Sequence, residues 1–225
     1  MVVVKYKKTG VGMFFSQINM IRILKRLLLV AGITLEKENM QQGDVYFSSP
    51  TRVGVESLCE YMVIETKENA KTVCFRLENI LPSWLEIVKG ADVVRKINIA
   101  SLNAYAKYQI SFDEYKSCKP KIEEFLNKDE ITVSYMLHGE TKTLNAKKGI
   151  YLYKLDENSL EIVAKVEGNS IRIDEFAKAL LKYLGKSKND FKVLKTNLYT
   201  LDKTGNLVDI DDVVEILNLS KGEIK

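Results

Sequence analysis

Residues 2–32 read VVVKYKKTGVGMFFSQINMIRILKRLLLVAG, and this stretch decides the fold. Its first part, Val2–Lys8, is rich in β-branched residues and predicts a strand that ends at the Thr9-Gly10 turn. Ser16 is then well placed to cap a helix, and Gly32 to end it. Between them, apolar residues recur at steps of three and four positions, at Met20, Ile21, Leu24, Leu27, Leu28 and Ala31. The chain therefore opens as strand, turn and helix.

The segment that follows extends this pattern to six elements. We expect strands at 45–49, 59–65 and 85–97 and a helix at 70–80. The helix ends before Pro82, which disfavours helical backbone at the residue preceding it. The resulting order, β-α-β-β-α-β, is that of the split-βαβ or ferredoxin-like motif. Such a unit packs its helices on one face of an antiparallel sheet, so we expect the other face to be available.

The second half of the chain shows a similar order of elements. We expect strands at 104–112, 131–137, 142–146, 150–155, 160–167 and 191–201, and helices at 119–126, 174–184 and 209–217. Pro120 is tolerable in the first turn of a helix that begins at Lys119. The predicted fold is α+β, with two ferredoxin-like units in series and helices on one face of each antiparallel sheet. The expected domains are residues 1–100 and 101–202, followed by a short C-terminal helix and tail at 203–225.

The composition is that of a globular protein, and it offers little to bind a metal. Of the 225 residues, 46% are apolar and 28% are charged, which argues against disorder. The three cysteines, Cys59, Cys74 and Cys118, include no CxxC pair, so we expect reduced thiols rather than a zinc or iron–sulfur site. His138 is the only histidine and lies in a predicted hairpin turn, where a catalytic role is disfavoured. We therefore expect no catalytic residue, no metal and no cofactor.

The most apolar window of the chain does not have the pattern of a membrane span. It runs from Ile18 to Ile33 and is interrupted by Arg22, Lys25 and Arg26, which a span of about 20 apolar residues would not tolerate. The chain also opens with a strand-like run of valines rather than the basic start of a signal peptide. We expect a cytoplasmic protein without a membrane partner.

Two blocks of sequence resemble a known bacterial family. The first comprises Lys5–Gly10, Phe14–Ser16 and Arg22, and the second comprises Val53–Ser57 followed by Glu60-Tyr61. These blocks are similar to the motifs R-F-L-S-H-L-D-L-x-R and V-G-V-E-S-x-x-E-Y of the radical-SAM-linked proteins. The proteins of that family have no assigned biochemical role and are encoded beside, or fused to, a B12-binding-type radical SAM protein. The resemblance covers residues 1 to about 65 well, and the remainder only in its order of elements.

The ionisable motif positions of the family are changed in this chain. Gln17 and Asn19 stand where the family has histidine and aspartate, and the family stretch G-F-N-P-H-P falls on residues 38–43. Glutamine and asparagine form hydrogen bonds but neither carry a proton at neutral pH nor bind a metal as imidazole does. The resemblance therefore implies a ligand-binding set without acid–base chemistry, made of Ser16, Gln17, Asn19, Arg22, Gln42, Arg52 and Glu56.

The basic residues near the N-terminus suggest a second kind of site. Six of them precede Glu36 with no acid among them, and they are Lys5, Lys7, Lys8, Arg22, Lys25 and Arg26. They form a candidate RNA or phosphate-binding surface, beside which Tyr6, Phe14 and Phe15 offer stacking surfaces. The alternative is a solvated helix face over core aromatics, which the small net charge of +4 favours.

The function that these patterns favour is that of a non-catalytic accessory or substrate-binding protein. The resemblance implies a radical SAM protein as its partner, and RNA or a ribosomal component is the partner class to test first. One alternative is an RNA-modifying or RNA-processing enzyme on a ferredoxin-like fold. Another is a protein–protein interaction module. An accessory protein shows no turnover alone, whereas an enzyme presents a cleft with convergent titratable groups.

Overall fold

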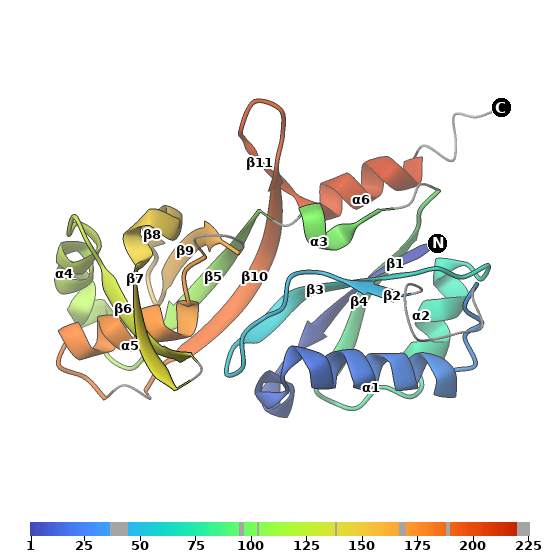
Figure 1. Cartoon of the computed structure of the whole chain (residues 1–225), viewed down its shortest axis with the longest axis horizontal. Coiled ribbons are helices and arrows are strands. Elements are labelled where there is room, and N and C mark those ends of the chain that lie inside the picture. Colours follow the sequence, from blue (N-terminus) through green and yellow to red (C-terminus); the bar gives the residue numbers. More distant parts are fainter. Residues whose placement is uncertain are drawn as a thin grey trace. The chain divides into compact units, whose positions relative to one another are not determined.

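The structure is a computed structural model, and it describes residues 1–36, 45–94, 97–102, 104–137, 139–166, 170–187 and 190–219. Within those residues the fold is mixed α+β, with six α-helices and strands that pair mostly antiparallel (Figure 1). The α+β class expected from the sequence is therefore confirmed. The chain divides into two compact units, Met1–Ala104 with Asn197–Lys225, and Tyr105–Thr196. The three-part division at residues 100 and 202 stays a prediction.

The first unit contains both motif blocks. Its elements are β1 (Val2–Lys8), the 3-10 helix η1 (Gly10–Phe14), α1 (Gln17–Val30), β2 (Val45–Phe47), β3 (Glu56–Ile64), α2 (Ala70–Glu78), β4 (Leu85–Asp92), α3 (Ile99–Leu102), β11 (Leu207–Asp209) and α6 (Ile210–Leu219). The strands lie in the order β4, β1, β3, and β2 also pairs with β3. These pairings are antiparallel, so Val4 lies opposite Met62 of β3 and Gly90 of β4.

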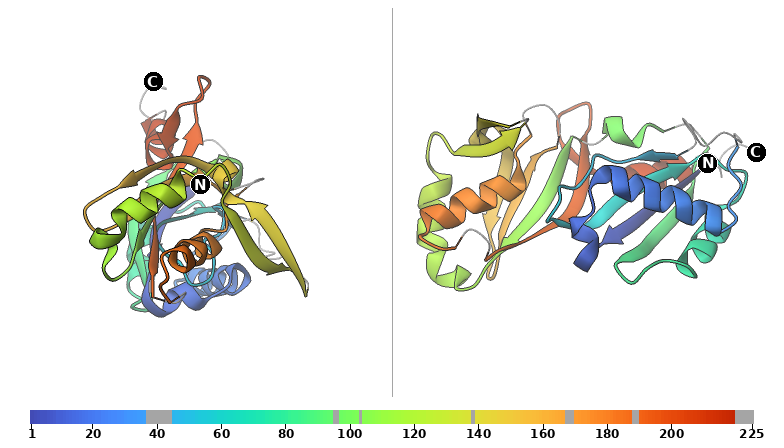
Figure 2. Two further views of the ribbon diagram at one scale, coloured as in Figure 1. Left: turned by 90° about the vertical axis from the view of Figure 1, so that its left-hand side faces the viewer. Right: turned by 60° about the horizontal axis from the view of Figure 1, so that its bottom comes forward.

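One face of this sheet carries the core of the unit. Val2, Val4 and Tyr6 point to it, because alternate side chains of a strand lie on the same face. Helices α1 and α2 cover this face (Figure 1), and α1 lies along the strands in the second view of Figure 2. The buried side chains that they contribute are Met20, Leu24, Leu28, Val73 and Leu77. The buried apolar residues of β1 and α1 therefore pack together in one core.

The predicted ends of α1 are confirmed. Ser16 precedes the helix, and its Oγ accepts a hydrogen bond from the backbone N–H of Asn19 at 3.4 Å. Gly32 follows it with a φ of +66°, a conformation that a residue without Cβ adopts readily. The 3-10 helix η1 between β1 and α1 is not predicted by the pattern. It packs on Trp84 through Gly12, where a Cβ atom would lie 2.6 Å from Trp84 Cε3.

The opposite face of the sheet is covered in part by α6 (Figure 1). Ile210 and Val214 of this helix are buried, and Asp211 contacts the side chains of Lys5 and Tyr61 on the strands. The expectation that this face would be available is therefore wrong where α6 lies on it. The physical reason is the amphipathic character of α6, which gains free energy by removing its apolar stripe from water.

The second unit has its own strands and buried apolar residues. Its elements are β5 (Tyr105–Ser111), α4 (Tyr115–Leu126), β6 (Thr132–Leu137), β7 (Glu140–Asn145), the 3-10 helix η2 (Ala146–Gly149), β8 (Ile150–Leu155), β9 (Leu160–Lys165), α5 (Ile173–Tyr183) and β10 (Lys192–Leu201). Strand β9 pairs antiparallel with β5 and β8, and β6 forms a separate hairpin with β7. Phe125 of α4 packs on Phe176 of α5, with ring centroids 5.8 Å apart.

Several element boundaries differ from the sequence expectation, as at β3, which begins at Glu56 rather than Cys59, and β4, which ends at Asp92 rather than Ile97. Helix α4 begins at Tyr115 rather than Lys119, so Pro120 lies inside the helix and not in its first turn. The elements α3, β11, η1 and η2 were not expected, because each is too short to show a periodic pattern. Strand β10 was expected, and its last residues, from Asn197 onward, belong to the first unit.

Candidate functional site

The two motif blocks lie together at one end of the first unit. The backbone N–H of Gly10 donates a hydrogen bond to Glu56 Oε1 at 2.7 Å, across 46 positions of the chain. A second hydrogen bond joins the N–H of Gly54 to the carbonyl oxygen of Met13 at 2.8 Å. The turn between β1 and α1 is therefore fastened to the loop before β3. Segments that resemble separate family motifs form one local structure.

A small polar pocket lies beside this junction, between β1, β3 and the first turns of α1. Its volume is about 20 Å³, which is enough for about one water molecule. The side chains that line it are those of Tyr6, Lys8, Gln17, Met20, Ile21, Phe47, Ser48, Pro50, Thr51 and Glu60. Four of its polar residues are buried, namely Lys8, Ser48, Thr51 and Glu60. Charged groups are rarely buried to this extent unless they have partners, so this pocket is the candidate site.

Hydrogen bonding and charge organise the interior of the pocket. The hydroxyl of Thr51 donates a short hydrogen bond to Glu60 Oε1. Glu60 lies directly opposite Tyr6 in the pairing of β3 with β1. Burial, and secondly the negative charge of Glu60, raise the pKa of Tyr6 well above its ordinary value, so its hydroxyl stays protonated. The pocket thus offers a carboxylate, an ammonium, hydroxyls and an amide to one small polar group.

The structure assigns different roles to the residues implied by the family resemblance. Gln17 lines the pocket, whereas Ser16 caps α1 and Glu56 holds the backbone of η1. Arg22 and Arg52 are exposed at the surface. The side chain of Asn19 is exposed as well, and its backbone N–H is the group that Ser16 caps. Gln42 and the rest of the stretch 38–43 lie outside the described residues, as does His138.

The six basic residues do not form one surface. Lys8 lines the pocket, while Lys5 and Lys7 point to the opposite face of β1. Lys5 pairs with Asp211 at 2.7 Å and Lys7 pairs with Glu86 at 2.6 Å. The remaining three lie together on the outer side of α1, where Arg22 and Arg26 are exposed and Lys25 is partly buried. The stripe on α1 is thus separate from the lysines of β1.

Sequence reasoning missed Glu60 and Thr51 as site residues. Glu60 is the last glutamate of the second motif block, so a signal was present in the resemblance. A glutamate is expected at an exposed position, whereas Glu60 is buried. Thr51 carried no signal, since its loop position says nothing about burial. Lys8 was recognised, but as a phosphate-binding residue rather than as part of a pocket.

Several apolar side chains of the two segments that meet at the motif junction are exposed. Val11, Phe14, Ile18 and Val53 each expose more than half of their side-chain surface. Val11 and Phe14 lie in η1, and Val53 directly precedes Gly54, which is hydrogen-bonded to Met13. Ile18 is the second residue of α1. Single exposed apolar residues are common, but a group of them is typical of a surface that meets another molecule.

Within the described part of the chain, no helix is both long and apolar enough to cross a membrane. A comparison with protein families matches residues 2–178 to the family described as an uncharacterized protein conserved in bacteria (DUF2344). No curated protein matches the sequence. The matched segment includes the motif junction, the pocket and most of the second unit. Because it spans well over half of the chain, the protein belongs to this bacterial family.

Proposed function

We propose that the protein is a non-catalytic accessory protein that binds a radical SAM partner through the junction of its two motif blocks. The partner is the one that the sequence resemblance implies. The observation that carries the proposal is the hydrogen-bonded contact between the blocks, at Gly10–Glu56 and Met13–Gly54. At this contact Val11, Phe14 and Val53 are exposed, and Ile18 is exposed in the first turn of α1. Exposed apolar groups held on a rigid frame are suited to binding a protein.

The chemistry of the pocket favours binding over catalysis. Gln17 contributes an amide where the family motif has histidine, and an amide does not exchange protons at neutral pH. Lys8 and Glu60 are buried in a space of about 20 Å³, which leaves little room for a substrate. The pocket is suited to one small polar group, such as a side chain or the end of a peptide from a bound protein. An accessory role follows from this combination.

We also propose that both units are ferredoxin-like. In the first unit, the strands lie in the order fourth, first, third, second, counted along β1, β2, β3 and β4. In the second unit, β10, β5, β9 and β8 follow the same order when β5 is counted first, with the hairpin β6–β7 inserted. The shared order supports a repeated split-βαβ arrangement.

The accessory role is tested by mixing the purified chain with the B12-binding-type radical SAM protein of the same bacterium. We expect a complex in sedimentation velocity, and at least ten-fold weaker binding for Phe14→Asp. Phe75→Asp is the matched control, because Phe75 lies on α2 and is exposed to 66%, against 62% for Phe14. The control variant should bind as the unchanged chain does. Absence of a complex, or equal weakening by both variants, argues against the proposal.

A separate measurement distinguishes an accessory protein from an enzyme. We expect no turnover of RNA or of the partner's substrate by the chain alone, and faster turnover by the partner when the chain is added. Processing or modification of RNA by the isolated chain would favour the enzyme alternative.

RNA binding by the stripe on α1 is the second candidate function. The exposed guanidinium groups of Arg22 and Arg26 lie one helical turn apart and can follow a phosphate backbone. Binding of this kind weakens steeply with salt, and Arg22→Glu with Lys25→Glu should abolish it. Binding that the double substitution leaves unchanged removes the stripe from consideration.

A further inference from the structure

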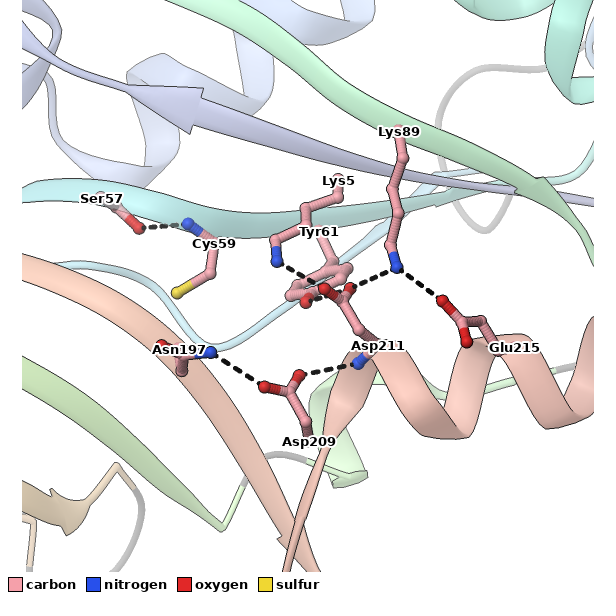
Figure 3. A network of polar contacts seen from close by, with 9 residues as sticks. All are labelled: Lys5, Ser57, Cys59, Tyr61, Lys89, Asn197, Asp209, Asp211 and Glu215. Atoms are coloured by element: carbon pink, nitrogen blue, oxygen red, sulfur yellow. Dashed lines mark hydrogen bonds and ion pairs between the residues drawn. The ribbon is translucent and has the colours of Figure 1, made fainter.

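Three hydrogen-bond donors from three neighbouring strands converge on the carboxylate of Asp211 (Figure 3). Lys5 Nζ of β1 lies 2.7 Å from Oδ2. The hydroxyl of Tyr61 on β3 donates to Oδ1 at 2.8 Å, and Lys89 Nζ of β4 lies 3.3 Å from the same oxygen. Hydrogen bonds to a charged group are stronger than neutral ones. Because the sheet and its core hold the three strands, the donors form a preorganised anion site.

The occupant of this site, α6, is a short helix that apolar and polar contacts hold on the sheet. The helix has ten residues, and isolated helices shorter than about 12–15 residues are marginal in water. Ile210 and Val214 are buried, and Val213 and Leu217 are partly buried, whereas Ile216 is exposed to 63%. The apolar contacts of α6 therefore act together with those of the Asp211 carboxylate. Its helical structure depends on docking, to which the ion pairs and the hydrogen bond of Asp211 contribute.

Water and other anions can replace the polar contacts of α6. Lys89 reaches Glu215 at 3.3 Å as well as Asp211, and the side chains of Lys89 and Glu215 are 35% and 67% exposed. Salt screens such pairs, and their contribution to stability is small. A more buried ion pair, such as Lys5–Asp211, is seldom better for stability than apolar residues of the same volume. Its best-attested use is to specify register or to act as a switch.

The start of α6 is held by contacts other than those of the Asp211 carboxylate. Strand β11 pairs with β10 through Tyr199 and Asp209, and α6 begins at the next residue. The carboxylate of Asp209 accepts hydrogen bonds from Asn197 Nδ2 and from the N–H of Asp211, both at 2.9 Å. The strand pairing holds the base of α6 in place, so the helix can leave the sheet without unfolding β11.

We propose that α6 is a displaceable cover, and that the face of β1, β3 and β4 beneath it is a docking site for an acidic amphipathic helix of a partner protein. The chemistry of the partner is that of the observed occupant. It carries a carboxylate with aliphatic residues one position before and three positions after it, as Ile210, Asp211 and Val214 do. Lys5 and Lys89 provide the complementary charge. Because α6 belongs to the same chain, its effective concentration at the site is in the millimolar range. A partner helix therefore binds only when its affinity for the site is high enough to displace α6 at that concentration.

The proposal is tested with a fluorescent peptide of residues 207–219, LVDIDDVVEILNL, as the helix supplied in trans. The full chain is compared with its Asp211→Asn/Glu215→Gln variant, in which the tethered cover is weakened. We expect the peptide to bind the variant at least ten-fold more tightly than the unchanged chain. A peptide with its own Asp211→Asn change should lose at least ten-fold in affinity. Adding Lys89→Gln to the variant should weaken binding of the unchanged peptide.

Hydrogen exchange provides a second readout that does not depend on the peptide. In the unchanged chain, we expect amides of α6 to exchange faster than those of α1, and the peptide to accelerate them further. In the variant, the α6 amides should exchange faster still, while the α1 amides keep their protection. Unchanged protection of α1 shows that the variant is folded.

Three results overturn the proposal. The first is exchange of α6 amides only at the rate of α1, which makes the helix a fixed part of the fold. The second is peptide binding that is equal for both chains or independent of Asp211. The third is Lys89-dependent binding of oligouridine to the variant without binding of the peptide, which would make this face an RNA site instead.

Discussion

The ammonium of Lys5 and the carboxylate of Asp211 form an ion pair of 2.7 Å, although 206 positions separate them in the chain. The side chains are only 11% and 23% exposed. This contact joins β1 to α6. Lys5, a candidate phosphate-binding residue in the sequence, is paired with a carboxylate of the same chain. The ion pair makes the C-terminal helix part of the first unit.

Removing the charge of Asp211 should destabilise the protein. Asp211→Asn leaves the Lys5 ammonium without its ionic partner in a mostly buried position. We expect the free energy of unfolding to fall by about 1–3 kcal/mol. Urea denaturation followed by circular dichroism measures the change.

The matched control for this substitution is Glu86→Gln. It breaks the Lys7–Glu86 pair, which has a similar length of 2.6 Å but exposed fractions of 32% and 63%. We expect a loss below about 0.5 kcal/mol, because solvent screens an exposed pair. Equal losses for the two variants would show that burial does not strengthen the contacts of Asp211.

The contacts of Asp211 with Lys5, Tyr61 and Lys89 should contribute less to the free energy of unfolding at low pH and at high pH. Burial opposes ionisation of Asp211, but hydrogen bonds from Lys5 and Tyr61 and the charges of Lys5 and Lys89 outweigh it and lower its pKa below 3.8. A lowered carboxyl pKa adds stability above pH 3.8, which is lost as the pH falls through the pKa of the folded state.

The basic end of this window is set by Tyr61 and Lys89. Burial, followed by the charge of Asp211, raises the pKa of Tyr61 above 10.0. Burial alone lowers the pKa of Lys89, but Asp211 and Glu215 raise it above 10.5 overall. Raised values add stability below these pH values, and the stability is lost as the pH rises beyond them. The difference in unfolding free energy between the unchanged chain and Asp211→Asn should therefore be largest between about pH 4 and 10. A difference that is constant from about pH 3 to 7 would contradict this.

The polar pocket should be sensitive to loss of a single hydroxyl. Thr51→Val removes the donor to Glu60 Oε1 and leaves a buried carboxylate with one hydrogen bond fewer. We expect a loss of about 1–3 kcal/mol in the free energy of unfolding. Thr132→Val is the control, because that hydroxyl meets Glu130 at 3.4 Å at the surface. Its effect on the free energy of unfolding should stay below about 0.5 kcal/mol. A comparable effect at both sites would show that burial does not increase the contribution of the pocket hydrogen bond.

The contact of η1 with Trp84 should not accept a side chain at position 12. Gly12→Ala places a Cβ atom 2.6 Å from Trp84 Cε3, so the indole or the turn must shift. We expect a loss of about 1–3 kcal/mol from overpacking, together with a changed emission spectrum. The fluorescence is easy to assign, because Trp84 is the only tryptophan. Trp84→Leu should relieve most of the loss in a double variant, and an additive result would place the strain elsewhere.

The elements that could be predicted are those whose signals are local. The β-branched run Val2–Lys8 and the capped, periodic segment from Ser16 to Gly32 correspond to β1 and α1. Strand β8 was also predicted at its observed bounds, Ile150–Leu155. In each case the apolar spacing and the flanking turn residues agree. Short elements such as α3 lack a full period and were missed.

The candidate site was predictable only in part. Gln17 was identified because it stands at a family motif position, and it does line the pocket. Glu60 was not identified, because its burial and its hydrogen bond with Thr51 depend on tertiary packing. The stripe of Arg22, Lys25 and Arg26 was predicted from helical spacing alone and does lie on one helix. Whether it binds RNA stays a prediction.

By itself, the sequence determined the α+β class, the order of the longer elements and the position of α1 with its cap. These features depend on interactions between residues a few positions apart, and the spacing of apolar side chains along the sequence indicates such interactions. Only the tertiary structure decided that α6 returns to the sheet and that Asp211 meets Lys5, Tyr61 and Lys89. It also decided which charged residues are buried in the pocket. Contacts between distant segments depend on the packing of the whole unit, and no local pattern records which partners that packing brings together.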